Sequence, residues 1–479
     1  MPEWSLRAAA VAAPPFAGSP SSRSSTGPKA APGRESRGGP RPVLLRLVLV
    51  LYLATLLIDA VRKVTGLPAS TTGVVYLITA LIYVTAMGGA GGRGRATPRT
   101  LPVWLFMLSA WCLAVAVAER IPPEMALLGW SSYVFFVPLA YVAAELAADD
   151  TVAIKILRVV TIVGAIVGAG AIAGSVLGQS APAILQPIDP TVGIHTYSAG
   201  NIYLAPSIFA TGEEASEQLL IALFAWAALA HLSGGRLRRI PSALLGVLII
   251  VGLLVTARRT DIDVAVGGIV AVLILGRVRG PKLAQPAAAR DAATTRYRLG
   301  AGVLLTAVGA TALILALGAN TLVSFLLSGS VESRIALMFS LTDSGSVLGQ
   351  GPGTSTQGAA VLGAAALVGL AQGSHAAYVL GGRTFIVVEG GLAKTWLELG
   401  IMGLALYGAV FWTALSPAIR SLRRIDGAGL ALTMLAIALG IVFLKGHQSL
   451  DNPLIQPLFW LAVGGTWGRM HAAARSTRR

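Results

Sequence analysis

The chain has 479 residues, of which 55% are hydrophobic and only 12% are charged, and its mean hydropathy is +0.73. Soluble globular proteins carry about 25% charged residues, so a chain this apolar cannot cover its surface with polar groups in water. The net charge of +16 does not indicate a nucleic-acid-binding protein, because the Lys and Arg residues lie in short clusters between apolar runs.

Residues 1–42 are rich in Pro, Ser, Gly and Arg and show no apolar period. This composition predicts a disordered, basic tail on the cytoplasmic side of a membrane. The first long apolar run begins near Val43, which is too far along the chain for the apolar core of a signal peptide.

Residues 43–470 are predicted to form an all-α, polytopic transmembrane bundle of about twelve spans. Windows of about 20 residues are apolar on every face, which is enough to cross a hydrocarbon core of about 30 Å at about 1.5 Å per residue. The predicted spans are 43–61, 71–90, 101–118, 124–146, 157–178, 216–233, 240–256, 262–279, 299–319, 391–415, 428–446 and 453–469.

Basic residues alternate between the connections, and this alternation predicts the topology. Clusters such as Arg93–Arg99, Arg236–Arg239 and Arg420–Arg424 occupy every second connection, as the positive-inside rule requires of cytoplasmic loops. An even number of spans then puts both termini, including the basic tail 471–479, in the cytoplasm.

Two connections on the opposite, extracytoplasmic side are long, 179–215 and 320–390. Long loops on a rigid scaffold tend to carry function. The second loop, between spans 9 and 10, is rich in Gly, Ser and Thr. It contains the sequence Gly-Gln-Gly-Pro-Gly at 349–353, a tight turn that allows the backbone to approach a ligand closely or that serves only as a turn.

Four Arg residues break the positive-inside pattern and are candidate anion ligands. They are Arg258, Arg259, Arg334 and Arg383. The planar guanidinium group binds phosphate oxygens through two parallel hydrogen bonds, so several outward Arg side chains around one cavity would suit a lipid-linked pyrophosphate. The structural alternatives are snorkelling, a pair between Arg258 or Arg259 and Asp261 or Asp263, a pair between Arg334 and Glu332, and simple solvation of Arg383.

Two residues of the second loop are candidate catalytic groups. Glu389 lies near the outer boundary of the tenth span and is a candidate general base, and His375 is a second candidate because His is a frequent proton acceptor. A loop His is also often only solvated. Glu398 stands four residues after Lys394, a spacing at which the two charges neutralise each other on one helix face. No spacing of His, Cys or carboxylates indicates a metal site, the lone Cys112 excludes an intrachain disulfide, and no cofactor is expected.

Four short motifs occur in an order that resembles the superfamily of O-antigen ligases and polysaccharide (O-antigen) polymerases. They are a span ending in Ala257-Arg258-Arg259-Thr260, the loop residue Arg334, the turn at 349–353, and Glu-Leu-Gly-x-x-Gly at 398–403. The resemblance covers roughly 200–420. It implies a glycosyltransferase of a bacterial cytoplasmic membrane that moves glycan from an undecaprenyl-pyrophosphate carrier to a glycan or lipid acceptor, with Arg259 and Arg334 as the matching Arg residues.

One departure from the family pattern bears on the type of enzyme. Ligases of the superfamily often have a His about nine residues before the Glu-Leu-Gly glutamate, and this chain has Glu389 there. The departure favours a polymerase-like or otherwise divergent member, with polysaccharide export proteins and membrane lipids as further expected partners. The alternatives are a transporter or flippase for a lipid-linked sugar or other solute, and a lipid-linked-sugar glycosyltransferase of another family, which would need an acidic pair in loop 62–70 where only Arg62 and Lys63 are charged.

Overall fold

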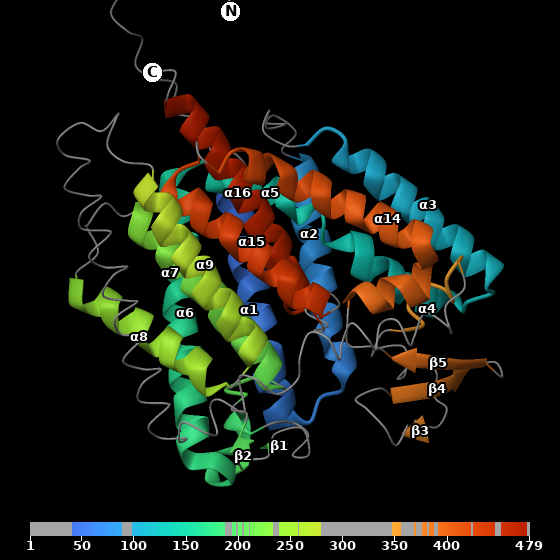
Figure 1. The fold of residues 1–479 in the computed structure, drawn as a ribbon, viewed down its shortest axis with the longest axis horizontal. Helices are drawn as coiled ribbons and strands as arrows, with labels where there is room; N and C mark the ends of the chain where they lie inside the picture. The colour runs from blue at the N-terminus through green and yellow to red at the C-terminus, as the bar shows by residue number, and fades with distance from the viewer. Residues whose placement is uncertain are drawn as a thin grey trace, which may run out of the picture. The chain divides into compact units, whose positions relative to one another are not determined.

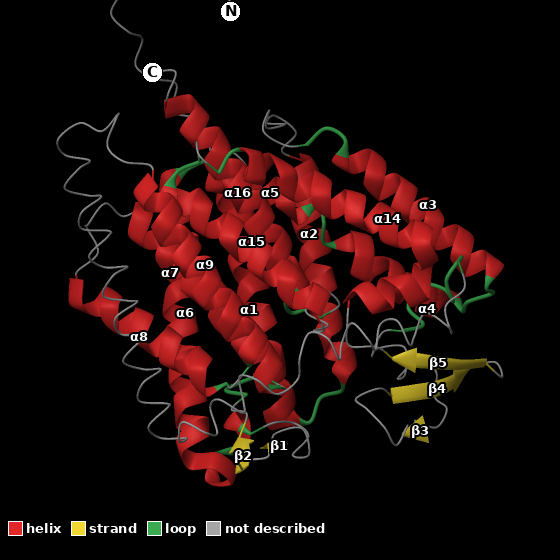
Figure 2. Ribbon diagram, in the orientation of Figure 1, coloured by secondary structure: helices red, strands yellow, loops and turns green. Residues whose placement is uncertain are grey.

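The described part of the chain is a set of helices with two small sheets at its loops (Figures 1 and 2). A computed structural model describes residues 41–88, 98–186, 194–197, 200–203, 206–209, 211–232, 239–256, 258–278, 347–355, 368–369, 376–380, 383–387, 391–422, 425–445 and 452–476. All of them belong to one folded unit, Pro40–Arg479. The predicted disordered tail, up to residue 40, lies outside the described residues.

Long helices account for most of this unit. The described helices before the second long loop are α1 (Arg41–Thr65), α2 (Gly73–Gly88), α3 (Leu101–Ala118), α4 (Pro123–Trp130), α5 (Leu139–Ala147), α6 (Asp150–Leu177), α7 (Gly212–Leu232), α8 (Arg239–Val255) and α9 (Arg259–Val278). Those after it are α14 (Gly391–Arg420), α15 (Gly427–Lys445) and α16 (Gln456–Ser476).

The prediction of a multi-pass helical membrane protein is confirmed. Eight of the described helical segments are long and apolar enough to cross a membrane, and Ala243–Val255 is a shorter apolar helix. Large apolar side chains face outward from these helices; on α3, for example, Phe106, Leu113 and Val117 are exposed. Such faces are costly in water and favourable in lipid. The predicted span 299–319 lies outside the described residues, so the count of twelve stays a prediction.

Local capping explains two helix starts that the hydropathy pattern placed too late. Helix α6 begins at Asp150 because the carboxylate of Asp149 accepts hydrogen bonds from the backbone N–H groups of Thr151 and Val152. Helix α7 begins at Gly212 because Thr211 and Glu214 form a reciprocal capping box, in which each side chain accepts a bond from the other residue's backbone N–H. Glu214 therefore belongs to a helix and not to the loop 179–215. At the other end of the chain, α16 continues to Ser476, into the predicted tail 471–479.

Helix α7 is buried along nearly its whole length, and α6, α8, α9 and α15 pack around it. Small residues allow close approach of these helices, as is common in membranes. A Cβ atom added to Gly164 of α6 would overlap Ala222 of α7, and one added to Gly464 of α16 would overlap the backbone of Ala140 in α5.

Within the described residues, strands occur only in the two long loops (Figure 2). The first loop contains the antiparallel hairpin β1 (Ile194–Tyr197) and β2 (Gly200–Tyr203), in which Ile194 pairs with Tyr203. The second contains an antiparallel sheet of β3 (Val368–Gly369), β4 (Ala376–Leu380) and β5 (Arg383–Val387) in sequence order. The hydropathy pattern did not predict these sheets.

Two predicted spans are interrupted. The span 124–146 consists of α4, one π-helical turn at Ser131–Phe135, and α5. Pro138 follows the π turn and has no N–H to continue a regular helix, which accounts for the change of geometry there. Helix α14 is broken at Gly400, and Figure 1 shows its two segments meeting at a bend.

Candidate functional site

Hydrogen bonds from the tight turn at 349–353 compensate for the break in α14. Gly400 has φ 63° and ψ −167°, which no helical residue adopts. Two carbonyl groups before the break accept bonds from the turn, Leu397 O from Gln350 N at 2.7 Å and Glu398 O from Gly351 N at 2.9 Å. The next carbonyl, Leu399 O, accepts a bond from Trp111 Nε1 at 2.8 Å. An unpaired carbonyl is expensive in a membrane, so these bonds make the break tolerable.

The glycines of this turn, which we name the GPG turn (347–355), are required by its geometry. Gly349, Gly351 and Gly353 all have positive φ angles of 86–113°. A Cβ atom on Gly349 would overlap the carbonyl of Glu398, and one on Gly353 would overlap the carbonyl of Met125. The close backbone approach expected from the sequence is therefore to the protein's own helices, α4 and α14.

A buried pair of charged side chains, Lys394 and Glu398, lies next to the GPG turn. The side chains of Lys394 and Glu398 are both 0% exposed, and Lys394 Nζ lies 4.0 Å from Glu398 Oε2. Glu398 Oε2 accepts a bond from the hydroxyl group of Tyr133 at 2.8 Å, and Glu398 Oε1 accepts one from the backbone N–H of Ser355, also at 2.8 Å. The predicted neutralising pair is confirmed, but the carboxylate also binds the turn.

The π turn and the start of α16 complete this buried polar cluster. Lys394 Nζ donates to Ser132 Oγ at 3.0 Å and lies 4.8 Å from the centre of the Tyr133 ring. The backbone carbonyl of Ser132 accepts a bond from Gln456 Nε2. Sequence reasoning missed Ser132, Tyr133 and Gln456; the available signal was that polar side chains inside apolar spans usually have a partner there.

The Arg258–Arg259 pair lies at the junction of α8 and α9. Arg258 forms an ion pair with Glu213, in the first turn of α7. Asp261 accepts a bond from the hydroxyl group of Ser216. Arg259 begins α9, and its side chain lies outside the described part of the structure.

A second polar cluster at the end of α1 was not anticipated as a site. Arg62 pairs with the buried Asp59 at 2.9 Å, and Lys63 Nζ donates to the carbonyls of Ile184 and Ser207, each at 3.1 Å. Glu214 accepts a bond from Asn452 Nδ2 at 2.7 Å. These contacts tie α1 to the first long loop, and the bond from Asn452 ties the start of α7 to the segment before α16.

Arg383 lies on β5, far along the chain from the Arg258–Arg259 pair. Its guanidinium group binds the Glu119 carboxylate at 2.9 Å and the Glu119 carbonyl at 3.3 Å, and lies 5.4 Å from the centre of the Phe385 ring. The side chain is 48% exposed, so it is a partly solvated contact between the second loop and the end of α3. The described contacts of Arg258 and Arg383 do not bring these two predicted ligands together.

The other three predicted site residues, His375, Arg334 and Glu389, lie outside the described residues. The described residues contain no group of three His, Cys, Asp or Glu side chains that could hold a metal ion.

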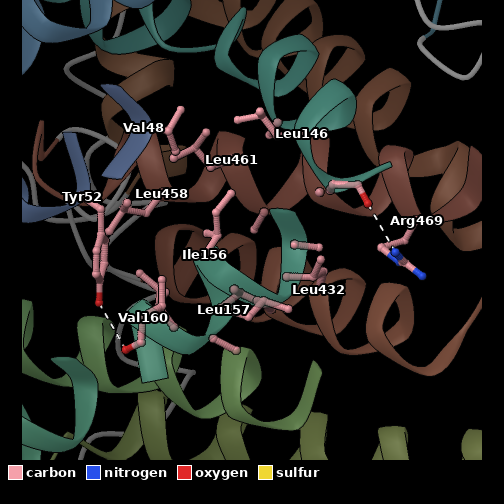
Figure 3. Close-up of a pocket in the computed structure, with 18 of the residues that line it drawn as sticks. Val48, Tyr52, Leu146, Ile156, Leu157, Val160, Leu432, Leu458, Leu461 and Arg469 are labelled. Atoms are coloured by element: carbon pink, nitrogen blue, oxygen red, sulfur yellow. Dashed lines mark hydrogen bonds between the residues drawn. The ribbon is translucent and has the colours of Figure 1, made fainter. Parts of the chain in front are cut away.

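A cavity of about 100 Å³ lies between α1, α5, α6, α7, α15 and α16 (Figure 3). Apart from Tyr52 and Arg469, all its lining residues are apolar or glycine. The Tyr52 hydroxyl group donates to the Val160 carbonyl, and Arg469 binds Asp150 and Asp426. Such a lining suits hydrocarbon and offers little to a sugar or a pyrophosphate. The buried polar cluster and the GPG turn are therefore the candidate functional site.

The comparisons with known proteins assign no family to this arrangement. No protein-family model matches the chain, and no curated protein is significantly similar to it.

Proposed function

We propose that the chain is a multi-pass enzyme of a bacterial cytoplasmic membrane that transfers glycan from an undecaprenyl-pyrophosphate carrier to a glycan or lipid acceptor. The transfer takes place on the extracytoplasmic side, and a polymerase is favoured over a ligase because Glu389 stands where ligases of the resembled superfamily often have His.

The observation that carries the proposal is the contact between two of the motifs on which the resemblance rests. The GPG turn and the sequence Glu-Leu-Gly-x-x-Gly at 398–403 are separated by more than 40 residues, yet they meet through the bond from Gly351 N to Glu398 O. Two short motifs that occurred by chance would have no reason to pack together. Their contact supports treating the set of motifs as parts of one functional unit.

The proposed chemistry needs few groups from the protein. An acceptor hydroxyl oxygen attacks the anomeric carbon of the donor, and the bond from that carbon to the pyrophosphate oxygen breaks. The lipid pyrophosphate leaves with the bonding electrons, and Arg259 and Arg334 stabilise its charge by bidentate hydrogen bonds. The hydroxyl proton passes to a base, for which Glu389 and His375 are the candidates.

A transporter for a lipid-linked sugar or other solute is the second candidate, and the broken helix α14 favours it. Broken helices in secondary transporters expose carbonyl groups that bind ions. In this chain, however, the carbonyls of Leu397, Glu398 and Leu399 already accept bonds from the GPG turn and Trp111. The break is therefore closed by the protein itself, which favours the enzyme.

The decisive experiment is the glycan profile of cells that lack the protein. Accumulation of short lipid-linked units would support a polymerase, and accumulation of full-length chains on the carrier would support a ligase. An unchanged profile of lipid-linked and surface glycans would contradict both, and accumulation of lipid-linked units only on the cytoplasmic side would favour a flippase.

The proposed topology has its own test, cysteine labelling in a Cys112→Ala background. Ser355 would be the wrong position for a topology label because its side chain is 0% exposed, whereas Val347, in the same turn, is 71% exposed. A Val347→Cys variant is expected to react with a membrane-impermeant maleimide added outside intact cells. Reaction only after the membrane is opened would place the GPG turn in the cytoplasm and contradict the proposal.

A further inference from the structure

We propose that Glu398 is a positioning residue that holds the GPG turn on the broken helix and thereby sets the geometry of the outer loop during glycan transfer. The second half of the proposal rests on the proposed function. The first half, the attachment of the turn, stands on contacts alone and is tested separately.

The carboxylate of Glu398 uses its two oxygen atoms for two different purposes. Oε2 faces Tyr133 and Lys394, which belong to the helical framework. Oε1 accepts the backbone N–H of Ser355, the last described residue of the GPG turn. One side chain thus links the framework to the turn. The bond is inside the protein, since Glu398 and Ser355 are both 0% exposed, so water does not compete for it.

The bond between Glu398 and Ser355 matters for the second long loop because of where the GPG turn lies along the chain. The turn lies in the second long loop, between the predicted ligand Arg334 and the strands that carry Arg383. Glu398 itself lies nine residues after the candidate base Glu389. The turn is therefore part of the same stretch of chain as the residues that are expected to bind the donor.

A simpler role for Glu398, neutralising Lys394, makes a different prediction. If neutralisation is the whole role, removing the positive charge makes the side chain at position 398 unimportant, provided that it is neutral. If Glu398 also positions the turn, an acceptor oxygen at that place remains necessary after the charge is gone.

The test therefore uses two variants without charge in the pair, Lys394→Met/Glu398→Gln and Lys394→Met/Glu398→Leu. Gln keeps an oxygen that accepts the Ser355 N–H, and Leu has a similar size without it. The probe is a Ser355→Cys substitution in a Cys112→Ala background, which leaves the backbone N–H of position 355 in place. Val347→Cys is the matched control because it is exposed whether or not the turn is attached.

We expect the cysteine at position 355 to react with a maleimide at least about tenfold faster in the Leu variant than in the Gln variant, because the turn opens locally more often. The control position should react equally fast in both. Equal protection of position 355 in the two variants would overturn the attachment of the turn by Glu398.

Glycan polymer made in cells at matched expression is the second measurement. The Gln variant should retain polymer and the Leu variant should lose it. Polymer retained in both variants, with position 355 exposed in the Leu variant, would overturn the proposed effect of Glu398 on glycan transfer.

If the Leu variant does not fold, Tyr133→Phe replaces it, since this substitution removes one hydrogen bond to Glu398 and keeps the aromatic ring. That variant should show an intermediate rise in labelling, and no rise would overturn the proposal. If deletion of the protein leaves the glycans unchanged, the proposed function is wrong. The labelling of position 355 still tests whether Glu398 attaches the GPG turn to the broken helix.

Discussion

Lys394 and Arg469 are two buried cations whose removal should have very different consequences. Each forms an ion pair inside the helical unit, and their side chains are 0% and 6% exposed. The difference lies in their partners. Glu398 is 0% exposed, whereas Asp150 and Asp426 are 68% and 30% exposed.

A Lys394→Met substitution leaves the Glu398 carboxylate buried without the Lys394 ammonium group. Breaking a buried pair in this way usually costs about 3–5 kcal/mol of unfolding free energy. An Arg469→Met substitution removes as much charge, but water can hydrate the two remaining carboxylates, so the cost should fall to about 1–2 kcal/mol. Lys394→Met/Glu398→Gln should recover most of the loss, because replacing both partners leaves no buried charge.

The unfolding free energy of the purified protein can be measured by SDS titration in mixed micelles, with helix content followed by circular dichroism. The three variants and the parent should be compared in the same detergent mixture. The reasoning would be refuted if Arg469→Met lowers stability as much as Lys394→Met, or if the double substitution is no more stable than Lys394→Met alone.

Three further outcomes are expected. Arg259→Ala and Arg334→Ala should each abolish polymer formation. Arg→Lys at either position should restore polymer only in part, because Lys cannot form the two parallel hydrogen bonds of the guanidinium group. Near-normal polymer from both Lys variants, measured at matched expression, would contradict pyrophosphate binding by these two Arg residues. Gly400→Ala should lower the unfolding free energy by about 1–3 kcal/mol, because Gly400 has a positive φ and an added Cβ would overlap the backbone of the GPG turn. Gly408→Ala in the same helix should be neutral or stabilising, because nothing lies within 4 Å of the added Cβ. Equal changes in unfolding free energy for the two variants would be inconsistent with the break. Ala225→Leu, which fills the apolar cavity of Figure 3, should leave stability unchanged or raise it by about 0.5–2 kcal/mol, and a clear loss in thermal unfolding would show that the cavity has no room.

Hydropathy determined the membrane class and the positions of the helices because both are local properties of the chain. A run of apolar residues must be helical in lipid, where each backbone group needs an internal partner, so length and composition are sufficient to locate a span. The tight turn at 349–353 was also visible, because only glycine adopts the positive φ angles found there. The starts of α6 and α7 could have been predicted from Asp149 and from the Thr211–Glu214 capping box, but the apolar pattern alone placed them too late.

Only the tertiary structure decided what these elements contact. The break at Gly400 lies within the predicted span 391–415, which the hydropathy pattern treats as one continuous helix, so the sequence pattern does not register it. The partner of that break is more than 40 residues away, and nothing in the turn itself specifies which helix it approaches. The same holds for the ion pair between Arg258 and Glu213, because the two residues are 45 positions apart and belong to different parts of the helical unit. Ion pairs and hydrogen bonds depend on distances between atoms, and packing of the helices sets those distances independently of separation along the chain.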